Sequence, residues 1–192
     1  MYELPTELEI AGEYYDIRKR GDYRMVLDVF SVLEDNSITH SERIIDALIL
    51  FYEYFNSMDD VLACSDIEEF VSAMFKFFNA DRQEGGRNNR KLIDWEQDSA
   101  LITSAINNVA GKEIRAEEYL HWWTFMGYYM AVGESTLSTI IGIRDKILKG
   151  KKLEKWERDF RNENPQYFTW NHESVDDKEA NEWIMSMWNN GV

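Results

Sequence analysis

Residues 116–132 have the sequence AEEYLHWWTFMGYYMAV, and this segment decides the fold most clearly. Successive residues of an α-helix are about 100° apart, and at that spacing the large apolar side chains of the segment fall within one broad arc. That arc consists of Tyr119, Trp122, Trp123, Phe125, Met126, Tyr129 and Met130. The opposite side carries Glu117, His121, Thr124 and Tyr128. The pattern predicts an amphipathic helix that packs against a large core.

The sequence contains no recognisable catalytic or metal-binding motif. His121 lies on the polar side of the predicted helix, four residues after Glu117, so we expect an exposed histidine that can pair with that glutamate. Neither it nor His40 or His172 has the spacing of a metal-ligand motif. No nucleophile elbow or dinucleotide-binding fingerprint occurs. The sequence therefore predicts no catalytic residue, no metal ligand, no cofactor and no enzyme activity.

Helical periodicity recurs on both sides of this segment, with start and stop signals between the helices. Capping boxes are predicted at Thr39 with Glu42 and at Ser65 with Glu68, and Asp94 with Gln97 marks another start. Glycines and one proline mark the ends of later helices: Gly111, Gly133, Gly150 and Pro165. We expect helices over about residues 22–34, 39–55, 65–78, 94–111, 116–132, 135–150, 153–164 and 176–190, with an exposed loop over 80–91.

The N-terminus predicts the only strands. Apolar residues of Leu8–Ile10 and Glu13–Ile17 flank the pair Ala11-Gly12, and glycine tolerates the positive φ of a tight hairpin turn. A two-stranded ribbon is marginally stable by itself, so we expect it to pack on the helices. The predicted fold class is mainly α, a helical bundle with a short N-terminal β-hairpin.

Composition restricts the classes of partner. The 192 residues include 36 acidic and 21 basic side chains, giving a net charge of −15. That charge repels phosphate backbones and anionic lipid, so nucleic acid and membranes are not expected partners. The lone Cys64 forms no internal disulfide and is expected to be a small buried apolar residue. The first residues do not resemble a signal peptide and no long apolar run follows, so we expect a cytoplasmic protein.

The last part of the chain is predicted to be separate from the bundle. We divide the chain into a helical domain with the hairpin, residues 1–165, and a segment of linker and amphipathic helix, residues 166–192. An isolated helix of about a dozen residues is marginal in water, so its apolar face needs a surface, either its own bundle or a partner. The candidate partner-binding residues on that face are Trp183, Ile184, Met187 and Trp188.

Several stretches of the chain match the pattern of a known family. They are Leu4-Pro5, Asp16-Ile17, Tyr23-Arg24, LILFY at 48–52, IIGIR at 140–144, the segment 153–165 and above all EYLHWWTF at 118–125. Across about residues 4–165 they resemble the bacteriophage "gene product fifteen" family of long-tailed phages of Gram-positive bacteria. The Leu-His-Trp-Trp run is the most specific part of this resemblance.

The resemblance implies a function that composition alone does not give. Such proteins are similar to tail assembly chaperones, small acidic proteins encoded just before the tape measure protein. It implies that the chain binds the phage tape measure protein and tail tube protein in the host cell cytoplasm. A permanent structural tail component remains an alternative, and an acidic DNA-mimic inhibitor of a nucleic-acid-binding protein is a more distant one. Homo-oligomerisation stays open.

Overall fold

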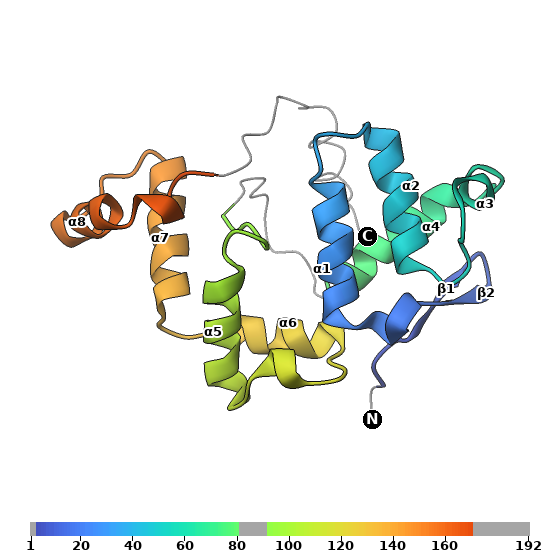
Figure 1. The fold of residues 1–192 in the computed structure, drawn as a ribbon, viewed down its shortest axis with the longest axis horizontal. Helices are drawn as coiled ribbons and strands as arrows, with labels where there is room; N and C mark the ends of the chain where they lie inside the picture. The colour runs from blue at the N-terminus through green and yellow to red at the C-terminus, as the bar shows by residue number, and fades with distance from the viewer. Residues whose placement is uncertain (1–2, 81–91, 171–192) are drawn as a thin grey trace. The chain divides into compact units, whose positions relative to one another are not determined.

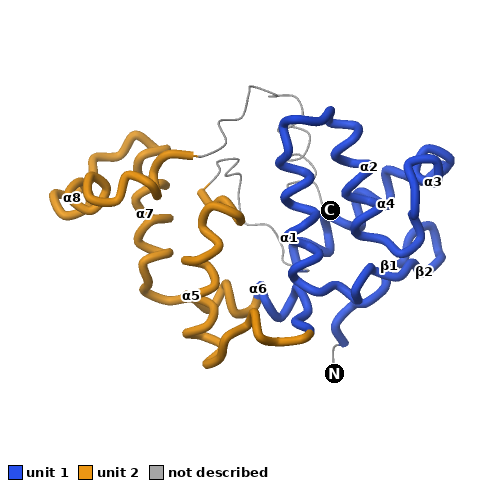
Figure 2. Tube along the Cα trace, in the orientation of Figure 1, with its two compact units in different colours: residues 1–87, 119–126, 175–192 blue, residues 88–118, 127–174 orange. Residues whose placement is uncertain are grey.

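The computed structural model describes residues 3–80 and 92–170 (Figure 1). Helices dominate these residues, whose only strands form one antiparallel hairpin, so the predicted mainly α fold with an N-terminal hairpin is confirmed. The chain divides into two compact units (Figure 2). Within the described residues, unit 1 consists of 3–80 and 119–126, and unit 2 of 92–118 and 127–170.

Unit 1 contains the hairpin and most of the aromatic residues. Its elements are β1 (Glu7–Ile10), β2 (Glu13–Asp16), a 3₁₀ turn (Arg18–Gly21), α1 (Tyr23–Leu33), α2 (His40–Phe51), α3 (Met58–Leu62), α4 (Ile67–Phe78) and the first part of α6 (Trp122–Met130). Unit 2 contains the rest of α6 together with α5 (Ser99–Ala110), α7 (Thr136–Leu148), α8 (Lys155–Glu163) and 3₁₀ turns at Ile114–Ala116 and Pro165–Tyr167.

The hairpin turns where the sequence predicted. Ala11 and Gly12 have φ of 52° and 86°, and two successive positive φ values are typical of the type I′ turn that connects twisted strands. Ile10 then lies opposite Glu13, and Ile10 is buried. Beyond β2, Ile17 pairs with Tyr52 at the end of α2, which joins the ribbon to the helices.

The core of unit 1 is built from aromatic rings that meet edge to face. Tyr52 lies against Phe70 with 5.1 Å between ring centroids, and Phe51 lies 5.4 Å from Phe78. Such contacts add to the stabilisation from burial, because the positive edge of one ring meets the negative face of the next. The Tyr52 hydroxyl donates to the carbonyl of Phe70 at 2.8 Å, and burial raises the pKa of this phenol well above its ordinary value.

Arg18 closes the C-terminal end of α2. Its guanidinium donates to the carbonyls of Ile49, Tyr52 and Phe55 at 2.9–3.1 Å. Carbonyls at the end of a helix have no partner within the helix, so this cation satisfies acceptors that would otherwise be left unpaired. No local sequence signal predicts this contact, because residues 31–37 positions apart form it.

The predicted helix starts were right at Thr39 and Ser135 and wrong at Ser65. The capping box of Thr39 with Glu42 is confirmed, and Ser135 caps α7 as predicted. The Ser65 box was wrong, because α4 begins after Asp66, whose side chain makes no capping hydrogen bond. The short helix α3, capped by Ser57, was missed altogether.

The helix start predicted at Asp94 with Gln97 was only partly right. Its carboxylate accepts from the backbone of Gln97 at 2.8 Å, but that bond closes a turn and α5 begins only at Ser99. The Gln97 side chain does not complete the box; it donates to the carbonyls of Gln166 and Thr169. The predicted left-handed residue Gly111 does end α5, with φ of 69°.

Unit 2 is organised around a buried ion pair. Arg144 and Asp98 are 4% and 0% exposed, and Nη2 of the arginine lies 2.9 Å from Oδ1 of the aspartate. Arg144 also donates to the carbonyls of Leu92 and Tyr167. A buried charge pair is tolerated only when its remaining hydrogen-bond donors also have acceptors. The carbonyls of Leu92 and Tyr167 are the acceptors for the remaining N–H groups of Arg144.

The buried side of α7 consists of Leu137, Ile140, Ile143 and Arg144. Ile147 and Leu148, in its last turn, are exposed. Cys64, expected to be buried, is half-buried. None of the helices in residues 3–80 and 92–170 is long and apolar enough to cross a membrane.

Candidate functional site

The most distinctive motif of the chain, Leu120–Trp123, forms a junction of backbone hydrogen bonds in unit 1. The Leu120 carbonyl accepts from the backbone of Tyr23, the first residue of α1, at 2.9 Å. The Leu120 amide donates to the carboxylate of Asp22, the residue that caps α1. These bonds hold the residues before Trp122 in an extended conformation, so α6 begins at Trp122 and the predicted start at Ala116 was wrong.

His121 is buried in this junction, and the prediction of an exposed histidine was wrong. It is 1% exposed. Its Nδ1 accepts from the amide of Trp123 at 3.0 Å, which caps the first turn of α6, so the proton lies on Nε2, which donates to the carbonyl of Pro5 at 2.9 Å. Burial lowers the pKa of His121, while the Pro5 carbonyl and Asp22 act in the opposite direction. Glu117, its predicted partner, pairs with Lys112 instead.

The two tryptophans of the motif close the end of α4. The indole of Trp122 donates to the carbonyl of Phe78 and that of Trp123 to the carbonyl of Phe77, both at 2.9 Å. These carbonyls belong to the last turn of α4, and that of Phe77 also accepts from the backbone amide of Ala80 at 3.0 Å. The Trp-Trp pair therefore gives each of the two carbonyls a side-chain donor.

Gly21 lies against the same junction. Its φ is 74°, and a Cβ added at this position would lie 2.8 Å from Cζ of Phe77 and 3.1 Å from Nε2 of His121. Glycine is therefore required here both for its positive φ and for the close approach. Apart from the bond between Trp123 and His121, the hydrogen bonds of Leu120–Trp123 link this motif to other segments of unit 1, which gives the motif a structural role.

Comparison of the sequence with protein-family models agrees with the resemblance that the motif carries. A family model described as "Bacteriophage Gp15 protein" matches residues 1–167. The chain belongs to the Gp15 family. Membership makes it a bacteriophage protein of the structural and assembly class. No curated protein and no solved structure matches the chain.

The structure offers this Gp15 protein no group of metal ligands in the part that it describes. No three side chains of His, Cys, Asp or Glu in residues 3–80 and 92–170 are placed to hold a metal ion. The predicted partner-binding residues Trp183, Ile184, Met187 and Trp188 lie outside the described residues, as does His172. That part of the site stays a prediction, and so does the division of the chain at residue 165.

Exposed apolar side chains do occur elsewhere in unit 1, next to the helix that the sequence did not predict. Tyr54, Met58 and Leu62 are 55%, 45% and 67% exposed, and Met58 and Leu62 are one turn apart on α3. Val61 on the other side of α3 is buried. We call Tyr54, Met58 and Leu62 the α3 surface. Ser57 followed three residues later by Asp60 is the local signal that would have found this helix.

Proposed function

We propose that this protein is a non-enzymatic tail assembly chaperone that binds the phage tape measure protein and aids tail tube assembly in the host cell cytoplasm. Membership of the Gp15 family over residues 1–167 carries the proposal, because the resemblance to that family implies this role. The proposed partners are the tape measure protein and the tail tube protein. Nucleic acid and membranes are not among them.

The surface chemistry supports such a role. A long helical partner exposes apolar stripes until the tube encloses it, and such stripes aggregate unless they are covered. The α3 surface provides exposed apolar contacts. The net charge of −15 keeps a complex dispersed, because like-charged complexes repel one another.

Two groups of residues are proposed to contact the tape measure protein. The first is the predicted C-terminal stripe, and the second is the α3 surface. Methionine and tryptophan suit contacts of modest specificity, because the unbranched methionine side chain adapts its shape and tryptophan buries a large area.

Co-expression tests the proposal. The tape measure protein of the same phage is expressed with and without this chain, and its soluble fraction is measured after centrifugation. We expect co-expression to raise that fraction. The variants Trp183→Ser with Trp188→Ser, and Met58→Ser with Leu62→Ser, should each reduce the effect. Val109→Ser, an exposed apolar residue of α5, is the matched control and should leave it unchanged.

Three results would contradict the chaperone role. An unchanged soluble fraction, with no co-purification of the two proteins at low or high salt, would exclude it. Detection of the chain in purified virions would favour the structural tail component. Binding to a nucleic-acid enzyme that weakens steeply with added salt would favour the DNA mimic, since apolar contacts lack such salt dependence.

A further inference from the structure

Strand β1 has one edge without a strand partner in the part of the chain that the structure describes. Its other edge pairs with β2, and the two-residue turn fixes Ile10 with Glu13 as a hydrogen-bonded pair. Hydrogen-bonded pairs alternate along an antiparallel ribbon, and the bond from Ile17 to Thr6 at 2.8 Å fits that alternation. The N–H and C=O groups of Glu7 and Glu9 therefore point away from β2.

These outward groups have no hydrogen-bond partner among the described residues. None of the bonds described for residues 3–80 and 92–170 involves the backbone of Glu7 or Glu9. Unpaired groups on a strand edge are a template on which another extended chain can add.

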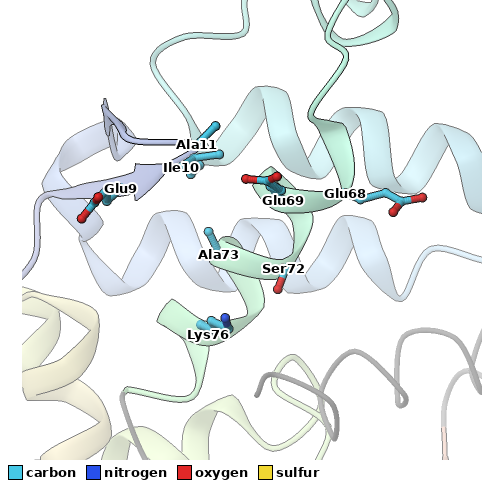
Figure 3. Close-up of a pocket in the computed structure, with 8 residues that line it drawn as sticks. All are labelled: Glu9, Ile10, Ala11, Glu68, Glu69, Ser72, Ala73 and Lys76. Carbon is cyan, nitrogen blue, oxygen red and sulfur yellow. The ribbon is translucent and has the colours of Figure 1, made fainter.

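A groove runs along this edge beside α4. A hollow of about 320 Å³ lies at the hairpin end, and Figure 3 shows the residues around it. It is lined by Glu9, Ile10, Ala11, Glu68, Glu69, Ser72, Ala73 and Lys76. A second hollow of about 210 Å³ is lined by Pro5, Leu8, Glu9, Ala73, Lys76, Phe77 and Trp123. The shared residues make the two hollows one feature, the β1–α4 groove.

The lining shows that the groove follows an edge of the strand. Successive side chains of a strand point to opposite faces, so a hollow on one face would be lined by alternate residues. Here Glu9, Ile10 and Ala11 line the first hollow consecutively, and Leu8 and Glu9 line the second. Consecutive residues border the same hollow only along the edge of the strand. At this edge the backbone N–H and C=O groups of Glu9 point outward.

The groove has a charged end and an apolar end. At the hairpin end its rim is formed by Glu9, Glu68 and Glu69. Figure 3 shows the Glu69 carboxylate on the side of Ile10 and Ala11, whereas the carboxylates of Glu9 and Glu68 point outward. Glu9 accepts a long bond of 3.4 Å from the Tyr14 hydroxyl. No cation within the described residues forms an ion pair with these three carboxylates. Lys76 lies between the two ends, and the far end is lined by Pro5, Leu8, Phe77 and Trp123. The excess of acid favours a basic occupant.

We infer that the β1–α4 groove binds an extended, basic segment of another protein, which adds to β1 as a third strand. The segment pairs with the backbone of Glu7 and Glu9, places lysine or arginine beside Glu68 and Glu69, and places an apolar side chain at the end near Trp123. A second copy of this chain is a poor occupant, because pairing two β1 edges brings the acidic side chains of Glu7 and Glu9 together. The inference does not rest on the chaperone role.

A labelled peptide tests the inference with the full chain. The probe is a fluorescent peptide of about ten residues, long enough for one strand, in which arginine and threonine alternate and one end carries leucine. We expect its fluorescence anisotropy to rise on titration with the protein. A peptide with glutamate in place of arginine should bind at least about tenfold more weakly.

Backbone methylation separates strand addition from charge attraction. N-methylation of alternate peptide residues removes the amides that face one side only. One of the two alternate sets should abolish binding, because its amides face β1, and the other set should leave binding nearly unchanged. Equal effects of the two sets would overturn strand addition.

Protein variants locate the site. Glu9→Pro removes an outward N–H without breaking the hairpin, and it should abolish binding, whereas Glu9→Gln should weaken it by less. Tyr14→Pro removes the equivalent outward N–H of β2 and is the matched control, with no effect expected. Circular dichroism melts confirm that each variant folds.

The charge variants predict effects of opposite sign. Glu68→Lys with Glu69→Lys should weaken binding of the basic peptide at least about tenfold, and Lys76→Glu should strengthen it. The inference is overturned if the basic peptide fails to bind, if Tyr14→Pro weakens binding as much as Glu9→Pro, or if Lys76→Glu weakens it. Self-association of the chain that Glu9→Pro abolishes would replace the basic segment with a second copy.

Discussion

At the scale of single residues, His121 shows how one side chain can be decided by contacts that are distant in the sequence. Helical periodicity placed it on a polar face, yet it donates to Pro5, which is 116 positions away, and caps the first turn of α6. A neutral imidazole suits both roles, because one nitrogen donates while the other accepts. Each role satisfies a partly buried backbone group.

We expect His121→Ala to lower the free energy of unfolding by about 1–3 kcal/mol, because it leaves the Pro5 carbonyl and the Trp123 amide without partners. Urea denaturation followed by tryptophan fluorescence measures the change. Glu118→Ala, an exposed position in the same segment, is the control and should change stability little. Equal stability of His121→Ala and the wild-type chain would show that the junction does not need the imidazole.

The same residue predicts a pH dependence. The folded-state pKa of His121 lies below its ordinary value of 6.5, so the unfolded chain binds the proton first as the pH falls. This contribution to stability is complete above pH 6.5 and is lost as the pH falls from 6.5 to the lower folded-state pKa. His121→Gln should have a shallower loss of stability in that window than the wild-type chain, as measured by urea midpoints. Parallel profiles of stability against pH for the two chains would show that His121 does not cause this loss.

At the scale of elements, helix starts depend on whether the capping residue has its reciprocal partner. Thr39 and Glu42 exchange bonds, with the Thr39 amide donating to the Glu42 carboxylate at 2.8 Å. Ser65 has the same local sequence pattern but lies one residue before the N-cap of α4. The pattern therefore marks a region where a helix starts, and packing of the apolar face selects the residue.

Paired alanine substitutions test this difference. Thr39→Ala should cost about 1 kcal/mol of stability, and Ser65→Ala should cost much less. Hydrogen bonds from Thr39 lower the pKa of Glu42 below 4.5, so the contribution of the box is present above pH 4.5 and is lost as the pH falls through the lower folded-state value. Thermal melts at neutral and acidic pH measure both effects. Equal costs at the two positions would refute the assignment.

At the scale of the whole molecule, residues 166–170, which follow Pro165, contact other residues of unit 2. The Tyr167 carbonyl accepts from Arg144, and the ring of Trp170 lies 4.3 Å from its guanidinium carbon. Gln97 donates to the carbonyls of Gln166 and Thr169. The buried cation thus contacts two residues, Tyr167 and Trp170, that a cut after Pro165 would remove.

Two truncations measure that dependence. A chain ending at Trp170 should unfold cooperatively, because the described contacts of Arg144 are complete. A chain ending at Pro165 should be less stable by about 2 kcal/mol, since hydrogen bonds to a buried charge are lost and the guanidinium is left partly unpaired. Differential scanning calorimetry compares the two. If both chains melt alike, Tyr167 and Trp170 do not stabilise the ion pair.

The sequence by itself determined the features that arise from local spacing. The hairpin turn at Ala11-Gly12, the Thr39 box, the Gly111 end and the helical class of the chain each depend on residues within a few positions of one another. Tertiary structure alone decided the others. The extended residues before Trp122, the buried states of His121 and Arg144, and the groove beside β1 depend on partners far along the chain. The physical reason is that a helix pattern reports which face is apolar, whereas long-range hydrogen bonds decide where the helix begins and which polar groups burial can satisfy.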